Sequence, residues 1–312
     1  MHSKIFNKFK KVESITDGIS AFSFLGTKTD CRYKYGWKPQ APGNKTTPSY
    51  PSASEWTADW IACLLAAYFA DENLRVIELG AGYAQWCVVT AFAYKQLCVD
   101  GEVSITALEA DQDHFKWMQE HVYTNTKQLA GVKEYLLNAA AGVDGEVSFP
   151  ILEEPSKTYG ASYVNKRHEK SRKTTNHWFL NLCRAILSRP RQQYNQVVSM
   201  SLESIFDLDK NIECVDLLHI DIQGAEKELL ESHRWKRDPI VKLILLGTHQ
   251  SDDLHMDSRQ HLENAGFEIV LDWAQNSAIA FNGESISTHD GALLACNPDI
   301  LDIGMVNELI GI

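Results

Sequence analysis

Short apolar runs alternate with amphipathic stretches from about residue 55 to the end of the chain. Seven runs have the length and β-branched character of strands: RVIEL (75–79), VSITALE (103–109), VKEYLLN (132–138), VDLLHI (215–220), VKLILLG (241–247), FEIVLDW (267–273) and ALLACN (292–297). Helical spacing of apolar residues marks stretches between them, at 84–97, 111–129, 225–235 and 256–266. A further helix is expected to begin at SASEW, capped by Ser52 or Ser54. This alternation predicts a mostly parallel sheet with helices on both faces.

The last two expected strands are joined by NGESISTHDG (282–291), which is too short for a confident crossover helix. A parallel connection needs about a dozen residues or more, whereas a hairpin needs far fewer. The spacing therefore predicts that the last strand runs antiparallel to the others.

Two segments fall outside the alternation. Residues 1–54 lack a sustained period and contain the loop-like PQAPGNKTTPSYP, so we expect an N-terminal extension that is a candidate substrate cap. Within it, Ile5, Phe6 and Phe9 predict a short helix docked on the body rather than on a membrane. Residues 55–312 form the main domain, interrupted at about 155–195 by an insert that is either a lid or a small subdomain.

Composition narrows the class of protein. The 312 residues are 44% hydrophobic, and no run approaches the length needed to span a bilayer. A formal net charge of −11 disfavours nucleic acid as a partner. The seven cysteines are scattered and form no CxxC pair, which argues against a disulfide framework and a zinc cluster. We therefore expect a cytoplasmic protein; the oligomeric state is not indicated.

The insert is basic within an acidic chain. Between Pro155 and Arg191 there are nine lysines and arginines against one acid, Glu169. Arg167 and Arg172 are candidates for binding an acidic acceptor, such as a phosphorylated or nucleotide-linked sugar. A solvated charged loop is the alternative.

The first chemical signal is VIELGAGYAQW (76–86), a glycine-rich turn between the first strand and a helix. Such a turn brings a ligand close to backbone N–H groups. The dinucleotide fingerprint needs a third glycine, but Gln85 stands there. Glu78 would repel a pyrophosphate and suits a cationic ligand, which favours S-adenosylmethionine over NAD. Glu78, Gly80, Ala81, Gly82 and Tyr83 are the expected cofactor residues in this turn.

The second signal is ITALEAD (105–111), at the end of the second strand. Glu109 can accept hydrogen bonds from both ribose hydroxyls, and Ala110 would lie beside the adenine. Asp111 is also a cofactor candidate, although it could instead cap the following helix. In NAAAG (138–142), Asn138 and Ala139 are expected to border the adenine, where small side chains leave space.

These motifs, followed by SLESIF (201–206) and HIDIQGAEKELL (219–230), resemble the FkbM family of S-adenosylmethionine-dependent methyltransferases over roughly residues 55–300. The resemblance implies a three-layer Rossmann-like class I methyltransferase fold, with a seven-stranded, mostly parallel sheet and an antiparallel last strand. It also implies O-methylation of a sugar, glycan or natural product. The N-terminal extension and the basic insert lie outside the shared pattern.

Asp221 and His249 follow the fourth and fifth strands, so both are expected at the edge of the sheet that faces the cofactor. In one interpretation His249 is the general base and Asp221 orients it or the acceptor. In a second, both residues hold a divalent cation, helped by Asp252 or Asp253; this is not favoured. In the third, Asp221 only caps the helix at Gly224 and His249 is an ordinary loop residue.

Two neighbours of Asp221 complete the candidates. His219 shares its sheet face one residue pair deeper, where a packed and hydrogen-bonded core histidine is expected. Gln223 is a candidate for binding the acceptor.

Two classes of function remain open at this point, an enzyme and a non-catalytic binding module. The leading one is an O-methyltransferase, and the retention of both Asp221 and His249 favours it. The alternatives are a non-catalytic module that binds S-adenosylmethionine and an N-methyltransferase of a small molecule. A dehydrogenase is less favoured because of Glu78 and Gln85.

Overall fold

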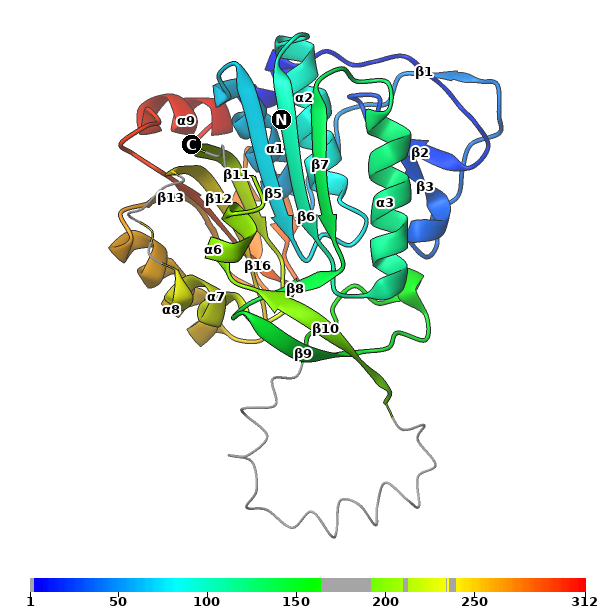
Figure 1. Ribbon diagram of the computed structural model, residues 1–312. Helices are drawn as coiled ribbons and strands as arrows, with labels where there is room; N and C mark the ends of the chain where they lie inside the picture. The colour runs from blue at the N-terminus through cyan, green and yellow to red at the C-terminus, as the bar shows by residue number, and fades with distance from the viewer. Residues whose placement is uncertain (1–2, 164–191, 210–212, 234, 236–239) are drawn as a thin grey trace.

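A seven-stranded sheet in the order β13-β16-β12-β11-β5-β6-β7 forms the centre of the molecule (Figure 1). The computed structural model describes residues 3–163, 192–209, 213–233, 235 and 240–312. The sheet strands are β5 (Asn73–Leu79), β6 (Glu102–Leu108), β7 (Val132–Leu137), β11 (Cys214–Ile220), β12 (Ile240–Thr248), β13 (Glu268–Trp273) and β16 (Gly291–Cys296).

All seven expected strands are present, so the predicted fold class is confirmed. Strands β12, β11, β5, β6 and β7 are mutually parallel, while β16 runs antiparallel between β12 and β13. A small hairpin, β14 (Ala278–Phe281) with β15 (Glu284–Ser287), occupies the short connection before β16. The order is that of the class I methyltransferase fold.

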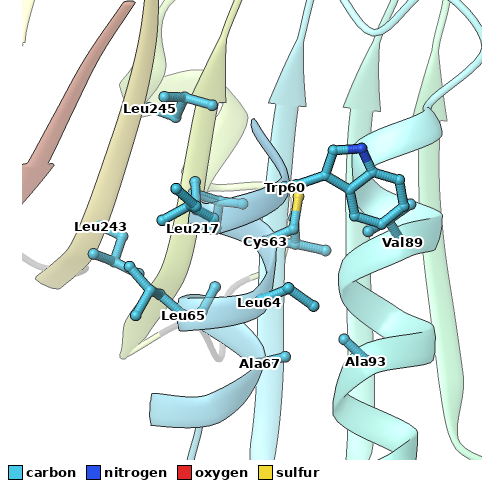
Figure 2. Close-up of a cluster of buried hydrophobic side chains, with 14 of the residues drawn as sticks. Trp60, Cys63, Leu64, Leu65, Ala67, Val89, Ala93, Leu217, Leu243 and Leu245 are labelled. Carbon is cyan, nitrogen blue, oxygen red and sulfur yellow. The ribbon is translucent and has the colours of Figure 1, made fainter. Parts of the chain in front are cut away.

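Helices cover both faces of the sheet, as the alternation predicted. On one face lie α1 (Thr57–Phe69), α2 (Gln85–Leu97), α3 (Gln112–Thr126) and α9 (Ile303–Ile310). On the other lie α6 (Leu202–Phe206), α7 (Glu226–Ser232) and α8 (Asp252–Asn264). Each strand divides its side chains between the two layers: Leu217 and Leu243 contact α1 in Figure 2, whereas Leu218 and Ile244 belong to the opposite cluster.

Helix α1 is buried along most of its length. Its side chains lie between α2 and strands β11 and β12, and Leu64 and Leu65 are fully buried (Figure 2). The predicted cap is wrong: the helix begins at Thr57 after Trp56, with no side-chain cap. Ser54 is one turn too early, and its N–H instead donates to Thr57 Oγ1 at 3.0 Å.

The N-terminal extension packs on the main domain. The short 3₁₀ helix η1 (Lys4–Lys8) buries Ile5 and Phe6, with Phe9 following, in the same core cluster as α1 and α9. The expected docked helix is therefore present. Short elements follow it: β1 (Ser14–Ile15), β2 (Ser20–Phe22), β3 (Lys28–Asp30), η2 (Cys31–Tyr33) and β4 (Lys45–Thr46).

A second, three-stranded sheet lies below the central one in Figure 1, in the order β8-β10-β9. It consists of β8 (Ala139–Ala141), β9 (Gly145–Pro150) and β10 (Tyr194–Met200). Strands β9 and β10 flank the basic insert, of which the first part includes the 3₁₀ helix η3 (Pro155–Lys157). Arg167 and Arg172 lie outside the described residues.

No helix in the described ranges is long and apolar enough to cross a membrane. The six described cysteines are free thiols, and four of them are buried.

A close approach of two strand ends fixes the glycine turn. The Asp221 N–H donates to Leu79 O at 2.9 Å, and a Cβ added to Gly80 would lie 1.8 Å from Asp221 O. Gly80 also has φ +74, which L-residues rarely adopt. Both the space and the backbone conformation therefore require glycine.

We expect Gly80→Ala to lower the free energy of unfolding by at least about 3 kcal/mol, because the ends of β5 and β11 must separate to admit the added methyl group. Gly43→Ala is the matched control: Gly43 has φ +84, but nothing lies within 4 Å of an added Cβ. It should cost only about 1 kcal/mol. Urea denaturation measures both, and equal losses would contradict the steric account.

Candidate functional site

A cavity of about 190 Å³ opens at the carboxyl ends of β5, β6 and β11. This is the edge where ligands bind in open parallel sheets, beside the point at which strand order reverses. Most of the expected site residues line it: Glu78, Gly80, Ala81, Gly82, Tyr83, Glu109, Ala110, Ala139, Asp221 and Gln223. We call it the first cavity.

Glu78 contributes a buried carboxylate to the wall of the first cavity. Only 2% of the residue is exposed, and its Oε2 accepts a hydrogen bond from the Cys87 N–H at 2.8 Å. Burial raises the pKa of Glu78 to about 7, although the charge of His219 and the Cys87 hydrogen bond oppose the rise. A cationic ligand group would stabilise the ionised form at this position.

Glu109, the expected ribose ligand, lines the first cavity directly after β6. Its two carboxylate oxygens accept hydrogen bonds from the Gly82 N–H and the Asp111 N–H, both at 2.7 Å. Burial raises the pKa of Glu109 to about 8 despite these two bonds. Each oxygen keeps a further lone pair, so ligand hydroxyls can still donate to it.

Two expected cofactor residues do not line the first cavity. The Asp111 carboxylate caps α3 by accepting from the N–H groups of Asp113 and His114, which was the alternative role considered for it. The Asn138 amide donates to the carbonyl oxygens of Glu109 and Ala110 at 2.8 and 3.1 Å. The Asp111 side chain is thus occupied in capping α3, and the Asn138 side chain in holding the turn that carries Glu109.

Aromatic side chains form a further part of the wall of the first cavity. Tyr159, from the start of the basic insert, stacks on His114 with ring centroids 4.4 Å apart and lines the first cavity. Its hydroxyl donates to Tyr33 O at 2.5 Å, and Tyr33 in turn stacks on Tyr83. The extension and the insert therefore meet at the cofactor turn.

A second cavity of about 130 Å³ adjoins the first. Trp56, Trp86, His219 and Asp221 line both. The rest of its wall carries acidic and small residues, which are Glu55, Asp59, Asp290, Gly247, Gly291 and Ala292, together with Leu245 and His249.

Asp221 lies at the junction of the cavities and is held by His249. His249 Nε2 is 3.2 Å from Asp221 Oδ1, and Nδ1 is 2.7 Å from Glu226 Oε1. Burial acts to lower the pKa of His249, but hydrogen bonds to the two carboxylates raise it to about 10. The imidazole is thus a cation at neutral pH. Burial acts to raise the pKa of Asp221, but its hydrogen bond with His249 brings it below the ordinary value.

Sequence reasoning overlooked Glu226, which contacts His249. It is fully buried in the first turn of α7 and supplies the second carboxylate on His249. It stands in the QGAE stretch, but helical spacing alone does not reveal that its side chain turns toward β12.

His219 is buried and hydrogen-bonded, as expected, but it also forms part of both cavity walls. Its Nε2 lies 2.9 Å from Asp59 Oδ1, contributed by α1, and its Nδ1 has no hydrogen-bond partner among the described residues. Burial acts to lower the pKa of His219, but the Asp59 carboxylate raises it above the ordinary value.

The structure also bears on the two other interpretations of Asp221. Helix α7 begins after Ala225, and no side chain in the described ranges caps it, so Asp221 does not serve as its cap. The Gln223 amide instead donates to Asp221 Oδ1 at 2.8 Å. Within the described ranges, no group of three or more His, Cys, Asp or Glu is arranged to hold a metal ion, and the suggested divalent cation has no support. Asp252 and Asp253 lie in the first turn of α8.

Comparison with known proteins identifies the relatives of the chain. The family model described as the methyltransferase FkbM domain matches residues 78–269. A protein of Jannaschia sp. (strain CCS1) named "Putative methyltransferase" is 26% identical over 258 residues, which are 80% of this chain and 82% of that protein.

Two solved structures are similar at low identity. The methyltransferase FkbM from Methylobacillus flagellatus KT has 10% identity and a TM-score of 0.37, covering 72% of this chain and 44% of that one. Magnesium protoporphyrin IX methyltransferase from Synechocystis PCC 6803, solved with bound S-adenosylmethionine, has 11% identity and a TM-score of 0.36, covering 78% and 79%.

We expect His249→Gln to lower the free energy of unfolding by about 3 kcal/mol at pH 7, since the fully buried Glu226 carboxylate loses its cation. A histidine whose pKa is raised on folding stabilises the protein fully below its unfolded value of about 6.5. That contribution disappears as the pH rises through about 10. The difference between wild type and variant should therefore shrink from pH 7 to pH 10. Urea denaturation across this range measures it, and a constant difference would show that His249 is uncharged.

Proposed function

The chain belongs to the FkbM family of methyltransferases, and on that premise we propose that it transfers the methyl group of S-adenosylmethionine to a hydroxyl group. The acceptor is a sugar, a glycan or a natural product. One observation carries the proposal: the Asp221 carboxylate lines both the first cavity and the second. A group at that junction can contact an acceptor oxygen that faces the methyl donor.

The first cavity suits S-adenosylmethionine in chemistry. Glu78 would bind the amino group, the turn at Gly80–Gly82 would lie along the nucleoside, and Glu109 would accept from the ribose hydroxyls. Ala139, Ala140 and Ala141 leave room for the adenine. When bound, the cofactor supplies an electrophilic methyl group on a sulfonium.

The second cavity suits a polyhydroxylated acceptor. Trp56 and Trp86 offer flat apolar faces. When ionised, the carboxylates of Asp59, Asp221 and Asp290 accept hydrogen bonds and cannot donate them. Hydroxyl groups donate to carboxylates, while the C–H face of a sugar ring packs on an indole. This combination supports a sugar or a similar ring as the acceptor.

In the proposed mechanism Asp221 orients the acceptor hydroxyl and receives its proton. As the new C–O bond forms, the acceptor oxygen becomes positively charged and its proton becomes acidic, so a carboxylate is a sufficient base. The C–S bond breaks and its electron pair stays on sulfur. His249 is already protonated at neutral pH, so its role is to hold Asp221 in place through the 3.2 Å contact. The role of general base, which was expected for His249 from the sequence, is therefore proposed for Asp221.

The acidic wall favours a second candidate, transfer to an amine. Asp290 lies beside Asp221 and Glu55, and burial and these two charges raise its pKa. An ammonium group would relieve that repulsion.

The expected acidic or phosphorylated acceptor depends on Arg167 and Arg172, which lie outside the described residues. The carboxylates of the second cavity disfavour an acidic group there.

A cytoplasmic location is part of the proposal, because the six described thiols are free.

Binding of the cofactor gives the first test. S-adenosylhomocysteine at a hundred times its Kd should stabilise the protein by about 2.7 kcal/mol, seen as a rise in Tm. NAD at the same concentration should leave Tm unchanged, because Glu78 opposes a pyrophosphate. Stabilisation by NAD alone would overturn the proposed function.

Turnover tests the role of Asp221, using an acceptor found by screening sugars, glycans and natural products with labelled S-adenosylmethionine. Asp221→Asn should lower kcat by roughly 10²–10⁴, because the amide cannot accept the proton, and leave the Kd of S-adenosylhomocysteine nearly unchanged. Asp290→Asn, which alters only the second cavity, should mainly raise the acceptor KM. An unaltered kcat in Asp221→Asn would exclude Asp221 as the base.

A further inference from the structure

Lys34 is a cation at the first cavity that lies outside the FkbM match. Among the described residues lining that cavity, it is the only lysine or arginine. It follows η2 in the N-terminal extension, whereas the family model begins at residue 78. No sequence motif singled it out.

Among the residues that the structure describes, no carboxylate lies within ion-pair distance of the Lys34 ammonium group. Its Nζ lies 3.3 Å from the ring centroid of Trp56, which lines both cavities, and no ion pair involves it in the described part of the chain. Burial lowers the pKa of Lys34 to about 8, although the charges of Glu55 and Asp59 oppose this. The group is therefore a partly desolvated cation that an anion would stabilise.

The backbone on either side of Lys34 is hydrogen-bonded to the first part of the insert. Tyr33 O accepts from the Tyr159 hydroxyl at 2.5 Å, and the Tyr35 N–H donates to Ser156 O at 2.9 Å. The Tyr33 ring also stacks on Trp117, with centroids 5.3 Å apart. Lys34 is thus held at the cavity between two fixed residues.

Charge complementarity identifies the anion. The methionine portion of S-adenosylmethionine carries an amino group, a sulfonium and a carboxylate. Glu78 would pair with the amino group, so the carboxylate still lacks a cation. Lys34 is the lysine that lines this cavity. We propose that Lys34 pairs with the cofactor carboxylate, so that the N-terminal extension completes the cofactor site. This inference rests on the proposed function, because it takes S-adenosylmethionine as the ligand.

The test compares three probes by calorimetric binding. S-adenosylhomocysteine has both the amino group and the carboxylate, its decarboxylated analogue keeps only the amino group, and 5′-methylthioadenosine has neither. Lys34→Ala should weaken S-adenosylhomocysteine roughly tenfold to hundredfold, as expected for loss of a charge-assisted hydrogen bond. The affinities of the other two probes should stay nearly unchanged, which also shows that the variant is folded.

Two further variants serve as controls. Lys34→Arg keeps the charge and should retain most of the affinity for S-adenosylhomocysteine. Lys157→Ala removes a lysine that lies 4.5 Å from the Tyr35 ring centroid and pairs with Glu154 but does not line the cavity, so it should bind all three probes like wild type.

The outcomes separate this inference from the proposed function. Equal weakening of all three probes in Lys34→Ala, or no weakening of any, would overturn the role of Lys34 and leave the proposed function standing. An effect of Lys34→Ala on the acceptor KM alone would do the same. If wild-type protein bound none of the probes, the proposed function itself would fail.

Discussion

The site depends on the point where β5 and β11 end side by side. There the Asp221 N–H bonds to Leu79 O, and Gly80 lies so close to Asp221 O that no side chain fits between them. Because the strand order reverses at β5, the loops after β5 and β11 diverge and leave a crevice. The glycine turn and Asp221 therefore face the same space, and every other residue of the site is arranged around that pair.

The second organising constraint is electrostatic. The crevice gathers carboxylates from different elements, and burial raises the pKa of Glu78 to about 7 and of Glu109 to about 8. Elsewhere a cation offsets the charge, as His249 does between Asp221 and Glu226. The first cavity is thus chemically suited to a ligand that brings its own positive charge, which agrees with the family to which the chain belongs.

The sheet could be predicted because buried strands have a repeating apolar pattern, and so could Asp221, which stands where such a strand ends. Contacts that join distant segments could not. Tyr159 and Lys34 come from segments without periodicity, and their position depends on packing between the extension and the insert. Helical spacing likewise could not show that Glu226 is directed at His249. Asp111 and its role as a helix cap could be anticipated only as one of two alternatives.

A crystal structure with S-adenosylhomocysteine would test the central claim most directly. The account predicts the adenosine beside Glu109, the amino group at Glu78, and the sulfur directed at the junction where Asp221 meets the second cavity. A ligand bound elsewhere, or a sulfur directed away from Asp221, would contradict the assignment of the two cavities and the mechanism built on it.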